Sequence, residues 1–347
     1  MLSTSLLLLG HSNLIWPKPR NAIDSLLPEW SDGRAPYASW WEDGRNPCEC
    51  INGTEACDIA QTCLWFSVGC GIGCDECDGT AANPNANDRC HNGMKPTVNN
   101  PLHRTYNRGA KAGSAEDWTK HNPWRAPGTA PVYDACGMAG GAPHPTPGHG
   151  EYTDTKFAKL GDRGSVALPP LDSGVVWRAG DIVETAWSIR ANHGGGWQYR
   201  LCPRGENLTE ACFSKTPLPF AGNSDLLLAN GTRFEIKSTF VTDGVMPLGS
   251  TWQMNPLPNT RDFPGGKFGN SSTYGYVFPP PCHETAPPMP LGHGICSGEW
   301  ITNITVYDKL RVPKGLKAGE YVLGYRMDCE SSAQVWSSCA DVTIVDY

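Results

Sequence analysis

The sequence contains no long hydrophobic run and no excess of basic residues. Beyond residue 10, no apolar stretch approaches the roughly 20 residues that a helix needs to cross a bilayer. The 28 Lys and Arg residues are outnumbered by 35 Asp and Glu residues, which gives a formal net charge of -7. Such a chain offers no basic surface to a phosphate backbone. We therefore expect neither a membrane nor a nucleic acid as a partner.

Glycine, proline and cysteine, in contrast, are abundant. The 39 Gly and 30 Pro residues disfavour the interiors of helices and strands, so turns and long loops are expected in place of a helical bundle. Fifteen Cys residues are a liability in a reducing cytosol, whereas in an oxidising compartment they can stabilise a loop-rich fold. We therefore expect a secreted, extracellular protein with disulfide bonds.

The start of the chain and five Asn-x-Ser/Thr patterns point to the same compartment. Residues 6–9 are apolar and are followed by the small Gly10, as at the end of a signal peptide. The run is short and lacks positive residues, so we interpret residues 1–10 as a signal-peptide remnant in a truncated gene model. Cleavage after Gly10 would make His11 the first residue. The acceptor sites, which predict a glycoprotein, are Asn52, Asn207, Asn230, Asn270 and Asn303.

Alternating apolar and polar residues predict strands in the second half of the chain. Two runs flank a glycine-rich turn, and we expect them to form a strand pair with His193 at the end of the first strand. Trp187, Trp197 and Tyr199, which lie in these two runs, are expected in the core. Together the alternating segments predict an antiparallel sandwich; they cover 181–190, 197–201, 234–240, 304–312, 321–327 and 342–345.

The remaining segments are expected to be loops that disulfides stabilise. Residues 16–47 predict an extended loop, and the cysteines within 48–90 predict a disulfide-tied insertion. A zinc site is the alternative there, because Cys74-x-x-Cys77 has ligand spacing, although secretion favours disulfides. Short separations predict the pairs Cys202–Cys212, Cys282–Cys296 and Cys329–Cys339, and leave Cys136 as the cysteine without an obvious partner.

His11 would gain unusual chemistry as the first residue of the mature chain. Its α-amino group and its imidazole can bind one metal ion together, and the imidazole of His193 would supply a third nitrogen. Three nitrogens in a flat arrangement suit copper, whose Cu(II) state favours tetragonal coordination, whereas zinc prefers a tetrahedron. The alternatives are a chance histidine after an apolar leader and a turn residue beside three glycines.

Three separated motifs resemble the lytic polysaccharide monooxygenases, including relatives described as chitin-binding type 4 domains. HSNLIWPKPR at 11–20 is similar to the mature N-terminus of that family, although Ser12 replaces the commoner Gly. WSIRANHGGGWQY at 187–199 is similar to the strand that carries the second copper histidine. GEYVL at 319–323, followed by QVWSSCAD at 334–341, resembles the C-terminal strand pair of the family.

The resemblance implies a fold and a cofactor. The fold is an all-β, immunoglobulin- or fibronectin III-like antiparallel sandwich with long, disulfide-tied loop insertions. It would form one domain from residue 11 to residue 347, with the Cys-rich insertion at 48–90. His11 and His193 would hold one copper ion. Gln334 would lie beside the oxygen-binding position, unless it is a surface glutamine, and Trp336 would occupy the axial face of the copper, where Tyr or Phe is usual.

The resemblance also implies oxidative cleavage of polysaccharide chains. Reduced copper, with dioxygen or peroxide, would hydroxylate C1 or C4 of a sugar ring, after which the glycosidic bond breaks. We expect a monomer that uses an external electron donor and acts on chitin, cellulose or another cell-wall glycan. The alternative is a non-catalytic carbohydrate-binding or copper-binding protein on the same fold. The aromatic residues that either stack on sugar rings or fill space beneath loops are Trp16, Trp30, Tyr37, Trp40 and Trp41.

Overall fold

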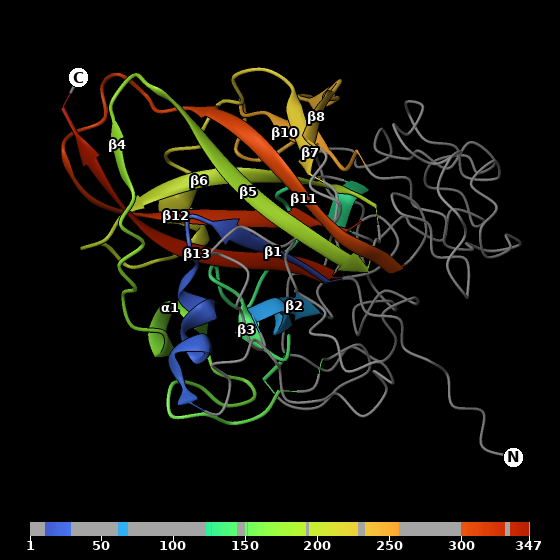
Figure 1. Cartoon of the computed structure of the whole chain (residues 1–347), viewed down its shortest axis with the longest axis vertical. Coiled ribbons are helices and arrows are strands. Elements are labelled where there is room, and N and C mark those ends of the chain that lie inside the picture. Colours follow the sequence, from blue (N-terminus) through green and yellow to red (C-terminus); the bar gives the residue numbers. More distant parts are fainter. Residues whose placement is uncertain are drawn as a thin grey trace, which may run out of the picture.

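The chain forms two β-sheets that pack face to face (Figure 1). This arrangement confirms the predicted antiparallel β-sandwich, with few helices and with disulfide bonds. No helix in the described part of the chain is long and apolar enough to cross a bilayer. The computed structural model describes residues 11–28, 62–68, 123–125, 127–143, 150, 152–191, 194–227, 233–256, 300–329 and 334–346.

The smaller sheet has five antiparallel strands in the order β1-β5-β11-β7-β8. In β5, Thr185 and Trp187 point into the sandwich and are buried, whereas Glu184 on the opposite face is exposed. β1 pairs along one edge of β5, so the N-terminal residues extend this sheet. The strands are β1 His11–Trp16, β5 Ile182–Ala191, β11 Trp300–Arg311, β7 Ser224–Leu227 and β8 Arg233–Ile236.

The larger sheet is built around its last strand, β13. The order is β3-β2-β13-β12-β6-β10-β9, and the neighbouring strands in this order are antiparallel. β4 also pairs with β13, and this pair is parallel. β2 contacts the beginning of β13 and β4 contacts its end. The strands are β2 Trp65–Val68, β3 Met138–Ala139, β4 Val176–Arg178, β6 Gly196–Pro203, β9 Phe240–Val241, β10 Trp252–Met254, β12 Gly319–Asp328 and β13 Gln334–Val345.

Large aromatic side chains fill the space between the sheets. Trp187 of β5 lies 4.5 Å from Trp197 of β6 and 6.0 Å from Tyr325 of β12, measured between ring centroids. Tyr199 of β6 lies 5.6 Å from Tyr325. These four side chains have no exposed surface. The prediction that Trp187, Trp197 and Tyr199 belong to the core is therefore confirmed, and each ring contributes a large buried apolar area.

The two strands that flank the glycine-rich turn do not form the predicted pair. β5 belongs to the smaller sheet and β6 to the larger one, so the connection at 192–195 passes from one sheet to the other. Alternation identifies the buried face of each strand, but both sheets of a sandwich show the same alternation, and it does not identify the partner strand. The end of β5 and the start of β6 consequently lie at the same end of the sandwich.

Short helices connect or cover the strands, and one of them corrects the expected extended loop at 16–47. Residues 20–26 of that segment form a buried 3-10 helix, η1 (Arg20–Leu26), whose Ala22 and Ile23 pack into small apolar clusters. The other helical turns are η4 Thr62–Leu64, η7 Pro123–Arg125, α1 Gly164–Ala167 and α2 Glu210–Phe213.

The disulfides confirm one predicted pair and correct another. Cys202 is bonded to Cys212, as predicted. Cys339 is bonded to Cys136, so the prediction of a bond with Cys329 is wrong, and so is the assignment of Cys136 as the cysteine left over. Cys329 and Cys339 are close in sequence, but the strand register places Cys339 opposite Gly324, about 17 Å along the hairpin from the level of Cys329. The predicted pair of Cys282 and Cys296 lies outside the described residues.

Candidate functional site

The backbone of His11 lies opposite Ala191, the last residue of β5. On its other side, Ala191 pairs with Trp300, the first residue of β11. Three strands of the smaller sheet therefore meet in one row at this end of the sandwich. His193 lies outside the described residues, as does the side chain of His11. Because His193 follows Ala191 by two residues, the covalent chain limits their separation to about 7 Å.

Buried hydrogen bonds hold β1 against the larger sheet. The hydroxyl of Ser12 lies 2.9 Å from that of Tyr325 in β12. Ser338 in β13 donates to Asn13 Oδ1 at 2.5 Å and accepts from the backbone N–H of Leu14 at 3.4 Å. Asn21 in η1 donates to the same Asn13 oxygen at 3.0 Å. The residues directly after His11 are thus tied to both sheets.

A buried ion pair fixes the segment that follows β1. Arg20 Nε and Nη2 donate to Asp341 Oδ2 and Oδ1 at 2.7 Å and 2.6 Å, and both side chains are 5% exposed. Two parallel hydrogen bonds from one guanidinium define its orientation as well as its position. η1 is therefore attached to β13, close to the anchoring contacts of β1.

The chain that follows His193 is fixed by two glycines. Gly195 has a φ of +89°, and a Cβ at this position would collide with the backbone carbonyl of Asp328 in β12. A Cβ on Gly196 would lie 2.5 Å from the ring of Trp124 in η7. The carbonyl of Gly195 also accepts a hydrogen bond from the N–H of Asn255 at 2.9 Å. The glycine-rich sequence therefore permits close packing at the start of β6, in addition to turning the chain.

Gln334 and Trp336 lie at the beginning of β13, at the same end of the sandwich. Asp328 of β12 pairs with Gly196 on one side and with Val335 on the other, which puts these segments at one level. Gln334 is 1% exposed, so the alternative of a surface glutamine is wrong. Trp336 is also 1% exposed and belongs to the main core cluster. Whether either residue borders a metal stays a prediction.

The Cys-rich segment contributes to this end of the sandwich. β2 pairs with β13 over Gln334, Val335 and Trp336. Phe66 of β2 stacks on the indole of Trp336, with ring centroids 4.3 Å apart and an angle of 22° between the rings. Part of the segment predicted as an insertion thus forms the strand beside both predicted residues.

A buried carboxylate, Asp308 of β11, lies deeper in the core. Burial raises its pKa to about 6, although Ser224, Tyr199 and Trp197 donate hydrogen bonds to it at 2.6, 2.8 and 2.8 Å. Burial also raises the pKa of Tyr325, the partner of Ser12. Tyr325 therefore contacts Ser12 as a neutral phenol throughout the physiological pH range.

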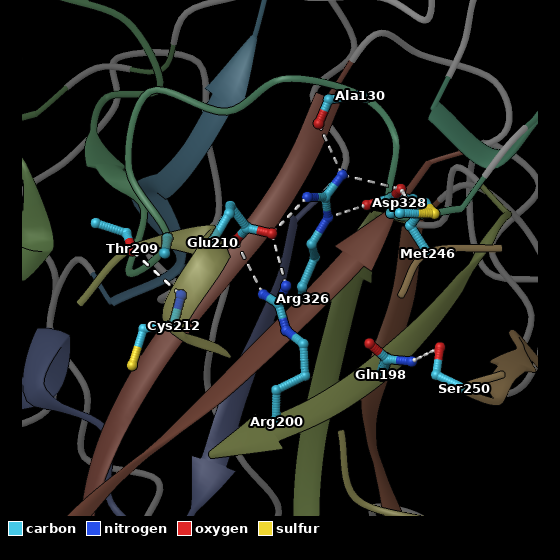
Figure 2. A network of polar contacts seen from close by, with 12 residues as sticks. Ala130, Gln198, Arg200, Thr209, Glu210, Cys212, Met246, Ser250, Arg326 and Asp328 are labelled. Atoms are coloured by element: carbon cyan, nitrogen blue, oxygen red, sulfur yellow. Dashed lines mark hydrogen bonds and ion pairs between the residues drawn. The ribbon is translucent and has the colours of Figure 1, made fainter. Parts of the chain in front are cut away.

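A second polar network covers the outer face of the larger sheet (Figure 2). Glu210 of α2 accepts from Arg200 at 2.6 Å and from Arg326 at 2.8 Å, and Arg326 also donates to Asp328 at 2.7 Å. Burial would raise the pKa of Glu210, but the two guanidiniums lower it to about 2. Arg326 continues to the carbonyl of Ala130 at 2.9 Å. The network joins α2, β6, β12 and the loop at 127–130.

The geometry of a metal centre is not visible in the described residues. They contain no cluster of three or more His, Cys, Asp or Glu side chains that could hold an ion. The imidazoles of His11 and His193, the predicted ligands, are not among them. What the structure brings together is the backbone of His11, the strand that leads to His193, and the start of β13 with Gln334 and Trp336.

Sequence reasoning missed several residues at this end of the molecule. Phe66 lies in the short apolar run Leu64-Trp65-Phe66, which is a recognisable strand signal inside the Cys-rich segment. Trp124 lies in a Pro-rich stretch without periodicity, so no local pattern indicated its position. Tyr325 belongs to a predicted strand. Its contact partner, Ser12, is 313 residues away in the sequence, and the packing of the two sheets brings the two side chains together.

Comparisons with known proteins give only distant likenesses. No protein-family model matches the sequence, and no curated protein matches it. Solved structures that resemble the chain include a lytic polysaccharide monooxygenase from Thermobia domestica in the Cu(I) state, at 15% identity and a TM-score of 0.23, over 49% of this chain and 62% of that one. A chitin-binding domain from Burkholderia pseudomallei has 14% identity and a TM-score of 0.32, and the match covers 97% of this chain and 100% of that domain. A lytic polysaccharide monooxygenase from Streptomyces lividans has 15% identity and a TM-score of 0.22, and the match covers 51% of this chain and 60% of that one.

Proposed function

We propose that the protein is a secreted, copper-dependent lytic polysaccharide monooxygenase. The observation that carries the proposal is the pairing of His11 with Ala191, two residues before His193. Two histidines that are 182 residues apart in sequence are thereby attached to neighbouring strand ends. The sequence resemblance names these two histidines as the copper ligands, and the described β-sandwich supports that resemblance.

The donor set fits copper. A freed α-amino group and two imidazoles supply three nitrogen ligands, which suit Cu(II) better than the tetrahedral preference of zinc. His11 and His193 would hold the ion. Bound copper would supply one-electron chemistry with dioxygen or peroxide for the oxidation of a sugar C–H bond at C1 or C4. An external electron donor would reduce the metal.

The role of the surrounding residues would be to fix this geometry. Ser12 and Asn13 hold the strand that begins at His11, and Gly195 fixes the chain after His193. Gln334 would be a positioning residue, since its buried amide lies at the start of β13 at the same end. Trp336 would not be a ligand, because an indole N–H has no lone pair to give. Its ring, stacked on Phe66, would exclude water from one side of the centre.

The substrate is proposed only as a class, namely chitin, cellulose or another cell-wall glycan. Trp16 is 39% exposed, but it lies at the other end of β1, about 17 Å along the strand from His11. It is therefore too far away to stack on the sugar ring nearest the proposed centre. The other aromatic candidates, Trp30, Tyr37, Trp40 and Trp41, lie outside the described residues. The disulfides support an extracellular location; a monomer is expected.

Copper binding by the secreted protein tests the proposal. N-terminal sequencing is expected to find His11 first, and titration to find one tight copper site. His11→Ala and His193→Ala should each weaken binding by several orders of magnitude, whereas the control His121→Ala should not. One extra residue before His11 keeps both imidazoles but displaces the amine, so it should weaken binding as well.

Activity separates the enzyme from its alternatives. With a reductant and oxygen, the copper-loaded protein should release oxidised oligosaccharides from chitin or cellulose, and His193→Ala should not. Tight copper binding without any oxidised product on a panel of cell-wall glycans would contradict the enzyme and favour a copper-binding protein. A mature chain that begins elsewhere than at His11 would overturn the copper site itself.

A further inference from the structure

We propose that Asn207 carries an N-linked oligosaccharide. Asn207 begins the pattern Asn207-Leu208-Thr209, in which the middle residue is not proline. Of the five acceptor patterns, this is the one whose three side chains are all described by the structure. The backbone carbonyl of Asn207 accepts a hydrogen bond from the N–H of Thr209 at 2.8 Å, but no hydrogen bond of its side chain is found in the described part of the chain, and the proposed copper centre does not involve it.

The environment of Asn207 can accommodate a large modification. Residues 203–207 are all exposed, and residues 204–209 connect the end of β6 to α2 without a helix or strand of their own. A Cβ added to Gly205 would meet no atom within 4 Å, so open solvent surrounds this loop. Leu208 packs instead against the apolar cluster that contains the Cys202–Cys212 disulfide. The loop is thus anchored through Leu208 while Asn207 faces solvent, as an oligosaccharide requires.

The position of Asn207 also separates the glycan from the candidate site. β6 begins at Gly196, at the end where His11 pairs with Ala191, and it ends at Pro203. Seven residue steps along a strand cover about 23 Å, and the loop continues beyond that end. A glycan on Asn207 would therefore project from the opposite end of the sandwich and leave the His11 end free for a polysaccharide.

The modification is a glycosyl transfer to the side-chain amide. The donor class is an oligosaccharide linked through pyrophosphate to a polyisoprenyl lipid. A bond forms between Asn207 Nδ2 and the anomeric carbon, the bond from that carbon to the phosphate oxygen breaks, and Nδ2 loses one proton. The lipid pyrophosphate is the leaving group, and no oxidant or reductant is consumed. Passage through a eukaryotic secretory pathway is required, but copper is not.

Thr209 has two roles, which the experiment must separate. It supplies the hydroxyl of the acceptor pattern, and in the folded chain its Oγ1 accepts a hydrogen bond from the N–H of Cys212 at 3.2 Å as the N-cap of α2. Serine keeps both roles. Asparagine is also a good N-cap but destroys the pattern, so Thr209→Asn removes the acceptor and keeps the helix start.

Mass spectrometry of the tryptic peptide 205–215 tests the proposal on the full chain, secreted from a eukaryotic host behind a complete signal sequence. The wild type and Thr209→Ser should carry an oligosaccharide that peptide N-glycosidase removes, leaving Asp at position 207. Asn207→Gln and Thr209→Asn should carry none, and Thr209→Asn should keep the thermal midpoint of enzymatically deglycosylated wild type.

An unmodified peptide 205–215 from the secreted wild type would overturn the proposal, provided that the same cells glycosylate a reference glycoprotein. A chain that is retained and unmodified inside those cells would contradict it equally. Copper binding and turnover can succeed or fail in either case, so this result is distinct from the test of the copper centre.

Discussion

The burial of Asp308 makes the unfolding free energy of the chain depend on pH. Its pKa is about 6 in the folded chain and about 3.9 in model peptides, so the folded state holds the proton more tightly than the unfolded state. The stabilising contribution of the protonated group is complete below pH 4 and is lost as the pH rises through about 6. Its loss corresponds to about 3 kcal/mol of unfolding free energy.

Asp308→Asn, which stays neutral, should remove this pH dependence. From pH 4 to pH 7, the unfolding free energy of the variant is expected to rise by about 3 kcal/mol relative to that of the wild type. Urea unfolding at several pH values measures the difference. Parallel stability curves for the two proteins would show that Asp308 does not titrate in this range.

Glu210 illustrates the opposite case, a carboxylate that two buried guanidiniums keep ionised. Glu210→Gln should cost about 3 kcal/mol of stability, because Arg200, 1% exposed, would lose the carboxylate that it is paired with, whereas Arg326 keeps its pair with Asp328. The matched control is Glu320→Gln, which removes an ion pair with Arg204. The side chains of Glu320 and Arg204 are 43% and 40% exposed, so this change should cost about 1 kcal/mol or less. Chemical unfolding of both variants at pH 7 makes the comparison; equal costs would contradict it.

At the scale of single elements, the anchoring of β1 has a direct test. Ser338→Ala should speed hydrogen exchange of the Leu14 amide and destabilise the chain by about 1 kcal/mol, since two hydrogen bonds to β1 disappear. Ser337→Ala is the neighbouring control, because no partner of the Ser337 hydroxyl is found in the described part of the chain. If both variants exchange alike at Leu14, Ser338 does not hold β1.

The strands could be predicted from the sequence more reliably than their partners. The alternation at 304–312 and 321–327 corresponds to β11 and β12, because a strand with one core face carries that pattern wherever it pairs. The run at 234–240 is divided into β8 and β9, which lie in different sheets. Pairing depends on contacts between distant residues, such as Ser12 with Tyr325, and no local pattern encodes these.

The candidate site shows the same division between local and distant information. The glycines after His193 and the motif at Gln334 and Trp336 are local, and they could be recognised directly. Phe66 also lies in a local strand signal, but the pairing of this four-residue strand with β13 depends on distant contacts that no local pattern encodes. The wrong assignment of Cys136 has the same origin, since its partner Cys339 is 203 residues away.

At the scale of the whole molecule, the disulfides should differ in what they contribute. Closing a long loop removes more entropy from the unfolded chain than closing a short one. Cys136 and Cys339 are 203 residues apart in the sequence, whereas Cys202 and Cys212 are 10 residues apart. Replacing the first pair by Ala should therefore lower the thermal midpoint more than replacing the second pair. The loop-closure model gives upper limits of about 5 and about 3 kcal/mol. Differential scanning calorimetry of the two double variants decides; a larger loss for the shorter loop would contradict the model.

β13 has a consequence for the synthesis of the chain. It contacts β12, β2 and β4, and through Ser338 and Asp341 it holds β1 and η1, yet it follows every other described strand in the sequence. While residues 334–345 are still inside the ribosome, the N-terminal strand lacks these partners. The contacts that anchor β1 and η1 to the larger sheet can therefore form only after residues 334–345 have left the ribosome, although β1, β5, β11, β7 and β8 precede them.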